Sequence, residues 1–139
     1  MNQTPGSTAE ELRLVVVQLV RRFRQDRELP PPQFNALSAL SRSGPLTTSQ
    51  LALQERVRPQ SMAHTVRQLD DAGLVVRRED PGDGRQTLIE ISESGRKAMT
   101  DFRRTADAWV NDAIKTRLTA KERSTLEAGI ALMRRLVDE

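Results

Sequence analysis

Several residue types with distinctive chemistry are absent or scarce in this chain of 139 residues. It has no cysteine, which excludes disulfides, a thiol redox switch and cysteine ligands for a metal. A zinc site is disfavoured because the chain has a single histidine, His64. It has no tyrosine, one tryptophan and three phenylalanines, so an aromatic-lined pocket would be thinly supplied. We therefore expect no metal and no metal-dependent chemistry.

Long apolar segments and targeting signals are missing as well. The longest apolar run, residues 14–17, is far too short to cross a membrane. The first eight residues lack the charged and apolar regions of a signal peptide. We therefore expect no membrane association and a cytoplasmic location.

The length and the charge of the chain leave most functions open. One hundred and thirty-nine residues suit one domain that buries its own core. A net charge of +3, from 22 basic and 19 acidic residues, is too mild to argue for nucleic acid. The distribution is more informative, because residues 56–67 contain three arginines and no acid.

The N-terminal part of the chain, about residues 7–28, reads as an amphipathic helix. Ser7 and Glu10 have the spacing of a capping box, which marks a helix start. Apolar residues then recur at intervals of three and four, and Leu14 and Val17 widen the apolar surface beyond one face. Such a helix suits two partners, its own core and a second subunit, although one buried helix in a monomer is the alternative.

The middle of the chain predicts two short helices joined by a tight connection. After a proline-rich break, a helix reaches about Ser43, and Leu46 is a candidate for a very short strand. Residues 47–50 form a capping box that opens the first short helix, and Pro59 suits the first position of the second. This pattern is typical of a helix-turn-helix.

The second short helix has a solvent face suited to a DNA groove. Opposite the apolar positions 62, 66 and 69, it carries short or planar hydrogen-bonding groups, namely Gln60, Ser61, Ala63, His64 and Arg67. A helix that enters the major groove needs uncharged or cationic groups close to its N-terminus. An ordinary solvated face is the alternative.

A β-hairpin is predicted directly after this helix. Residues 74–78 and 86–91 are strand-like, and residues 80–84 between them contain two glycines and a proline. We expect the turn to be longer than the turn of a minimal hairpin, and we expect Arg85, at the end of this turn, to point outward. A cationic probe of this kind suits the phosphate-lined groove of DNA.

The C-terminal third predicts two further amphipathic helices. Ser92 can cap a helix of about 25 residues that ends near Leu118, and residues 119–122 form another capping box. Gly95 lies in the first turn, where close packing is expected. The helix-turn-helix and the hairpin together make a winged helix-turn-helix, and the first helix and the last two are not part of it. These terminal helices can bury their apolar stripes against a second chain.

Residues 69–95 carry the pattern of a known family. Leu69 and Gly73 are followed by the basic pair Arg77 and Arg78, by Asp83-Gly84-Arg85, and by Ile91, Ser92 and Gly95. This pattern resembles the MarR family of bacterial transcriptional regulators, with Ile91 and Ser92 where Leu and Thr are usual. The resemblance covers nearly the whole chain by length and element order.

The resemblance implies a mainly α fold with a small β-hairpin wing, an α+β winged helix-turn-helix. It implies one MarR-type domain over residues 1–139, in which about residues 30–92 bind DNA. About residues 7–28 and 93–139 would form the dimerisation helices. The implied function is a sequence-specific DNA-binding regulator that acts as a homodimeric repressor on a pseudo-palindromic promoter site.

The expected DNA contacts follow from this reading and from the chemistry of each side chain. The resemblance implies that Arg85 enters the minor groove and that Asp83 holds it by a salt bridge, with a simple turn-forming role for Asp83 as the alternative. Base readers are expected at Gln60, Ser61 and His64, with phosphate contacts from Arg58, Arg67, Thr48 and Ser49. His64 as a neutral surface residue, and Thr48 and Ser49 as capping residues alone, remain alternatives.

Two other classes of function are alternatives to a DNA-binding regulator. An enzyme is disfavoured, because His64 and Ser61 have no orienting carboxylate at helical spacing and no phosphate- or dinucleotide-binding motif occurs, so no cofactor is expected. A winged helix that serves only as a dimerising protein-interaction scaffold is the second alternative.

The resemblance also implies a response to a ligand. The family suggests release from DNA by a small phenolic or other aromatic acid between the dimer and DNA-binding regions, with arginines such as Arg13 as partners for a carboxylate. Constitutive repression is the alternative.

Overall fold

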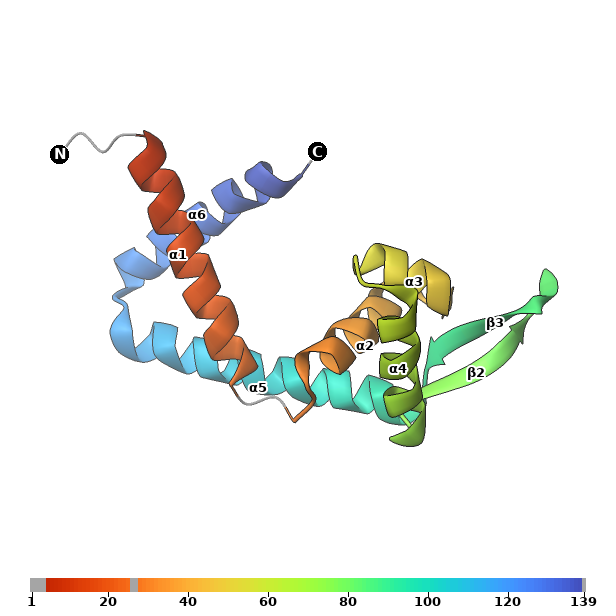
Figure 1. Cartoon of the computed structure of the whole chain (residues 1–139). Coiled ribbons are helices and arrows are strands. Elements are labelled where there is room, and N and C mark those ends of the chain that lie inside the picture. The colour runs from red at the N-terminus through yellow and green to blue at the C-terminus, as the bar shows by residue number, and fades with distance from the viewer. Residues whose placement is uncertain (1–4, 26–27, 139) are drawn as a thin grey trace. The chain divides into compact units, whose positions relative to one another are not determined.

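The protein is described by a computed structural model that covers residues 5–25 and 28–138 (Figure 1). Its elements, in chain order, are α1 (Pro5–Arg24), α2 (Pro31–Ser43), β1 (Leu46–Thr47), α3 (Thr48–Gln54), α4 (Pro59–Asp71), β2 (Val75–Asp80), β3 (Asp83–Ile91), α5 (Glu93–Arg117) and α6 (Ala120–Val137). This is the expected mainly α fold with a small β-hairpin wing, and the middle of the chain is a winged helix-turn-helix. The chain divides into two compact units, Met1–Phe102 and Arg103–Glu139, and α5 runs from one into the other.

Local chemistry fixes most of the helix boundaries. At the start of α3, the Thr47 hydroxyl accepts a hydrogen bond from the Gln50 N–H at 3.1 Å, and the Gln50 side chain accepts one from the Thr47 N–H at 2.9 Å. The predicted capping box is therefore confirmed. Two prolines occupy the first turn of α2, and Gly44 ends that helix with a φ of 77°.

The first helix differs from its predicted boundaries. It begins at Pro5 rather than at the Ser7 capping box, and it ends at Arg24 rather than near residue 28. Proline suits the first helical position because its missing N–H is not needed there. Residues 26 and 27 of the predicted segment lie outside the described residues.

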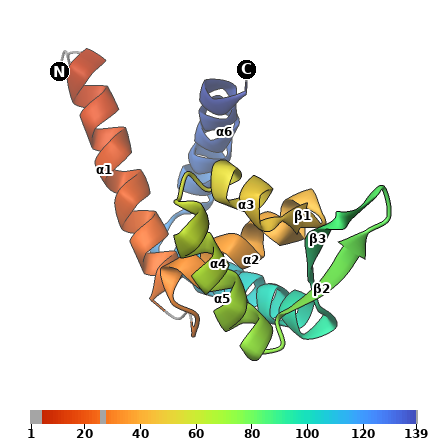
Figure 2. The same cartoon turned by 45° about the vertical axis from the view of Figure 1, so that its right-hand side comes forward.

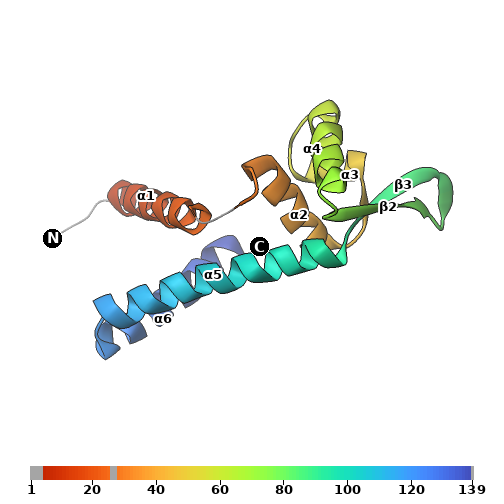
Figure 3. The same ribbon diagram turned by 90° about the horizontal axis from the view of Figure 1, so that it is seen from below.

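The hydrophobic core of the first unit joins α2, α3 and α4 to the sheet and to the beginning of α5. In Figure 3, α2 lies between α4 and the first half of α5. The Phe34 and Phe102 rings meet edge to face at 4.5 Å between their centroids, which holds α2 against α5. The largest fully buried side chains are Leu37, Leu40, Leu51, Leu69, Ile89, Val66 and Val75.

The three strands form an antiparallel sheet in the order β1-β3-β2. Leu46 pairs with Ile89, which confirms the very short strand predicted at Leu46, and Val75 pairs with Ile91. The β2–β3 hairpin extends away from α4 as a wing (Figures 1 and 2).

The tip of the wing corrects the sequence prediction. The strands extend until Asp80 pairs with Asp83, so the turn contains only two residues, 81 and 82, instead of the expected longer tip. The Asp80 carboxylate accepts a hydrogen bond from the Gly82 N–H at 2.9 Å, which stabilises the turn. Glu79 pairs with Thr87, so residues 84–86 form a bulge that takes up the extra length.

A tight junction joins the end of α4 to the start of α5. The Ser92 hydroxyl donates to the Gly73 carbonyl oxygen at 2.6 Å and accepts from the Gly95 N–H at 3.0 Å. A Cβ at Gly95 would overlap the Leu74 carbonyl oxygen and lie 2.7 Å from Ile91 Cγ1. The predicted capping role of Ser92 and the need for close packing at Gly95 are both confirmed.

The second unit begins within α5 and ends with α6. The Thr119 hydroxyl accepts from the Glu122 N–H at 3.1 Å, and the Glu122 carboxylate accepts from the Thr119 N–H at 2.9 Å, which confirms the last capping box. Across the described residues, every helix is too short or too polar to cross a membrane.

Candidate nucleic-acid interface

The connection between α3 and α4 is a strained helix-turn-helix turn. Arg56 has a φ of 55°, and it is the one positive φ at a residue other than glycine among the described residues. The Val57 N–H then donates to the Ala52 carbonyl oxygen at 3.0 Å, which closes the turn before Pro59 starts α4. The sequence predicted a tight connection here but did not identify Arg56 as the residue that takes the left-handed conformation.

Helix α4 buries one face and presents the other to solvent. Met62, Val66 and Leu69 are buried, as predicted. The predicted base-reading residues Gln60, Ser61 and His64 are exposed, and so is Arg67. No acid occurs between Arg56 and Leu69. The structure therefore gathers these side chains on one helix as an uncharged to cationic surface.

The predicted phosphate-binding hydroxyls lie at the start of α3. Because Thr47 provides the capping hydroxyl, Thr48 and Ser49 occupy the first two helical positions and are not needed as caps. Ser49 is exposed and Thr48 is half-buried. Thr47, and not Thr48 or Ser49, caps α3. The hydroxyls of Thr48 and Ser49 therefore stay available for another partner.

Asp83 acts on the backbone of the wing in this structure. Its carboxylate accepts a hydrogen bond from the Arg85 N–H at 3.1 Å, and the ion pairs found across the described residues do not join the two side chains. The expected Asp83–Arg85 salt bridge is therefore corrected to a turn-forming contact. Arg85 lies in the bulge with its side chain exposed.

The arginines near the wing fall into two groups. Arg77 Nε lies 3.2 Å from Asp70 Oδ2, which ties the base of the wing to the end of α4, and Arg78 Nε lies 3.4 Å from Glu90 Oε2. Within the described part of the chain, Arg58, Arg67 and Arg85 form no ion pair. The three arginines predicted to contact DNA are therefore free to bind an external anion.

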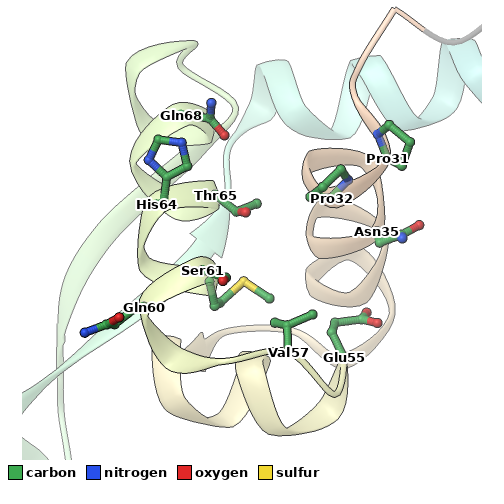
Figure 4. Close-up of a pocket in the computed structure, with 11 residues that line it drawn as sticks. Pro31, Pro32, Asn35, Glu55, Val57, Gln60, Ser61, His64, Thr65 and Gln68 are labelled. Atoms are coloured by element: carbon green, nitrogen blue, oxygen red, sulfur yellow. The ribbon is translucent and has the colours of Figure 1, made fainter.

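A pocket of about 640 Å³ lies between α2 and α4, next to this surface (Figure 4). Its lining comes from the first turns of α2, the α3–α4 connection and α4, namely Pro31, Pro32, Asn35, Glu55, Val57, Gln60, Ser61, Met62, His64, Thr65 and Gln68. The sequence did not predict it, because it forms between residues up to 37 positions apart and no local motif marks it.

Comparison with known proteins agrees with this geometry. The model of the MarR family matches residues 28–86. An HTH-type transcriptional regulator of Mycobacterium tuberculosis (strain CDC 1551 / Oshkosh) is 39% identical, with 100% of this chain and 99% of that protein covered. An HTH-type transcriptional repressor of Mycobacterium tuberculosis (strain ATCC 25618 / H37Rv) is 35% identical over 94 residues, which cover 66% of this chain and 65% of that protein.

Solved structures show the same fold. A transcriptional regulator protein from Pseudomonas aeruginosa PA01 has a TM-score of 0.86 and 33% identity, and the match covers 99% of both chains. A mutant of MepR from S. aureus, solved bound to an oligodeoxyribonucleotide, has a TM-score of 0.71 and 19% identity over 99% of this chain and 100% of that chain, which shows the fold alone. The full-length relatives, the family match and the winged helix-turn-helix together establish that this chain belongs to the MarR family of transcriptional regulators.

Proposed function

We propose that this DNA-binding transcriptional regulator is a cytoplasmic homodimeric repressor that binds a pseudo-palindromic promoter site. The observation that carries the proposal is the solvent face of α4, which is exposed, hydrogen-bonding and free of acids from residue 59 to residue 69. One of the relatives is a transcriptional repressor, which supports repression rather than activation by this chain.

Each part of the surface has a separate role. Gln60, Ser61 and His64 read base edges in the major groove, where the amide of Gln60 can pair with both exposed groups of an adenine. Phosphates are bound by Arg58, Arg67, Thr48 and Ser49, which fix the register without reading sequence.

The wing supplies the minor-groove contact. Arg85 enters the groove, where guanidinium is preferred over ammonium because it is less strongly hydrated. Asp83 positions Arg85 through the backbone contact at 3.1 Å, and the two-residue turn keeps the tip narrow.

Exposed apolar side chains on the terminal helices support a dimer. On α1, Leu14, Val15, Val17, Leu19 and Val20 are each between 39% and 52% exposed. On α6, none of the residues is buried in the single chain, and six large apolar side chains are exposed. A second copy would cover such surfaces, and a twofold dimer would place two α4 helices about 34 Å apart, one turn of DNA.

The first experiment is a titration of the purified chain onto the DNA upstream of its own gene, with excess nonspecific competitor and at two salt concentrations. We expect competitor-resistant binding that weakens as salt rises, because phosphate contacts release counterions. Binding equal to that of random DNA would contradict sequence-specific regulation. No binding at low salt would favour the protein-interaction scaffold.

Arg85→Ala tests the role of the wing. We expect DNA binding to weaken by roughly ten-fold while the dimer stays intact, because the exposed side chain makes no ion pair with another described residue. The matched control is Arg117→Ala, which removes an exposed arginine from the end of α5. Unchanged DNA binding by Arg85→Ala would show that the wing tip does not contact DNA.

A further inference from the structure

The tip of the wing contains the one aspartate of the chain that is followed by a glycine. Asp83 and Gly84 are both exposed, at the place where β3 begins (Figure 1). Such a pair is chemically reactive, because the peptide nitrogen of the glycine can attack the side-chain carboxyl carbon of the aspartate. Glycine permits the attack because it has no Cβ to obstruct the approach and its backbone is the least restricted.

The fold holds Asp83 in an arrangement that favours this attack. Its carboxylate accepts a hydrogen bond from the Arg85 N–H at 3.1 Å. The ring that this hydrogen bond closes includes the Gly84 peptide nitrogen, so the carboxyl group stays folded over that nitrogen. Groups held close together react faster than the same groups in a freely moving chain. Apart from its chain neighbours, a Cβ added at Gly84 would find no heavy atom of the described residues within 4 Å, so the site is open to water.

Asp80, on the other side of the turn, makes the same kind of contact but cannot react in this way. Its carboxylate accepts a hydrogen bond from the Gly82 N–H at 2.9 Å. The nitrogen that would have to attack belongs to Pro81 and carries no hydrogen to lose. Five further aspartates lie in α4 and α5, where helical hydrogen bonding holds the next peptide nitrogen in place, namely Asp70, Asp71, Asp101, Asp107 and Asp112.

We propose that the Asp83–Gly84 unit is a site of spontaneous isomerisation, and that its conversion to isoaspartate removes the wing from DNA recognition. The Gly84 nitrogen forms a bond to the Asp83 carboxyl carbon, and the carboxyl hydroxyl leaves as water with the proton of that nitrogen. The product is a cyclic succinimide. Water then opens the ring. Cleavage of the original peptide bond leaves isoaspartate, and cleavage of the new bond restores aspartate, so water is the only co-reactant and nothing is oxidised or reduced.

Isoaspartate changes the position of Arg85. The main chain then runs through the former side chain of residue 83, which makes it longer by one methylene group. The carboxylate also moves, so the contact with the Arg85 N–H that positions the arginine is lost. A displaced guanidinium fits a narrow minor groove less well. This second half of the proposal rests on the proposed function, whereas the isomerisation itself does not.

Peptide mapping of an aged sample tests the covalent step. The purified full chain is kept in warm neutral buffer and then digested with trypsin, which releases residues 79–85 as one peptide. We expect two new forms of this peptide, one lighter by a single water and one of unchanged mass that a protein isoaspartyl methyltransferase methylates. Endoproteinase Asp-N, which cuts before aspartate but not before isoaspartate, assigns the change to position 83. An unmodified peptide, or isoaspartate at Asp80 instead, would overturn the proposal.

Two alanine variants of the wing test the role of the glycine. Gly84→Ala places a methyl group beside the attacking nitrogen, and we expect the reaction to slow by about ten-fold or more because the attack needs close approach. The matched control is Gly82→Ala, which makes the same change in the same turn and should react at the wild-type rate. Neither glycine has a left-handed φ, and both positions have room for a Cβ. Equal rates in Gly84→Ala and in the wild-type chain would overturn the proposed attack.

The effect on recognition is measured separately, by fluorescence anisotropy of a labelled promoter duplex. Fully converted wild-type chain should bind DNA roughly ten-fold more weakly than fresh chain, as expected for a lost arginine contact. Gly84→Ala aged in parallel should keep the affinity of its own fresh form. Unchanged affinity in a sample rich in isoaspartate would overturn the effect on DNA. Failure of the DNA-binding proposal would be seen with the fresh chain and would leave the peptide map unaffected.

Discussion

At the scale of single residues, Arg56 is held in a conformation that an arginine does not favour. The left-handed region costs a residue with a Cβ about 1–2 kcal/mol, and glycine avoids this cost but loses more backbone entropy on folding. We expect Arg56→Gly to raise the free energy of unfolding by about 0.5–1 kcal/mol, measured by urea denaturation. The backbone of the helix-turn-helix turn requires the positive φ of 55° whichever residue is present.

The same variant should weaken DNA binding. Arg56 is exposed beside the start of α4, so its removal takes a positive charge from the proposed interface and lowers the salt dependence of binding by about one unit of slope. The control is Arg56→Lys, which keeps the charge and the strained backbone and should change neither property. If Arg56→Gly bound DNA as well as the wild-type chain, the strained arginine would have no role in recognition.

At the scale of elements, the start of α6 depends on the charge of Glu122. The hydrogen bonds from the Thr119 backbone and side chain lower the pKa of Glu122 below its ordinary value of 4.5. A lowered pKa in the folded state means that this stabilisation is present above pH 4.5 and is lost as the pH falls through the lowered value. We expect helical circular dichroism to decrease over this range, and less so in Glu122→Gln.

The matched control for this pH effect is Glu127→Gln, which removes a carboxylate from the middle of α6. It should leave the acid transition of the wild-type chain in place, because Glu127 is outside the capping box. An acid transition identical in Glu122→Gln and in the wild-type chain would show that the capping box contributes nothing to it.

At the scale of the whole molecule, the exposed apolar side chains of α6 predict a dimer. Ile130 is 44% exposed in the single chain, so Ile130→Glu should fold normally but separate a dimer of about 31 kDa into chains of 15.6 kDa, as measured by light scattering. Promoter binding should fall with it, because one chain reaches only one half-site. The control is Ala128→Glu on the opposite face of α6. A dimer that survives Ile130→Glu would place the interface elsewhere.

The sequence by itself determined the features that depend on a few neighbouring residues. Both capping boxes, at Thr47 and Thr119, and the cap at Ser92 are formed within four residues, so their hydrogen bonds follow from spacing alone. The amphipathic pattern identified the buried and exposed faces of α4 for the same reason, because helical periodicity is local.

The tertiary structure alone decided the features that depend on how distant segments meet. The two-residue turn of the wing follows from the register of β2 against β3. In this turn the Asp83 carboxylate accepts a hydrogen bond from the backbone N–H of Arg85, and it does not pair with the Arg85 side chain as predicted. In the sequence, Thr65 is one of several polar residues of α4 and nothing marks it as buried. Its burial is decided by α2, which packs beside α4. Such contacts are set by the packing of the whole core, and no local spacing encodes them.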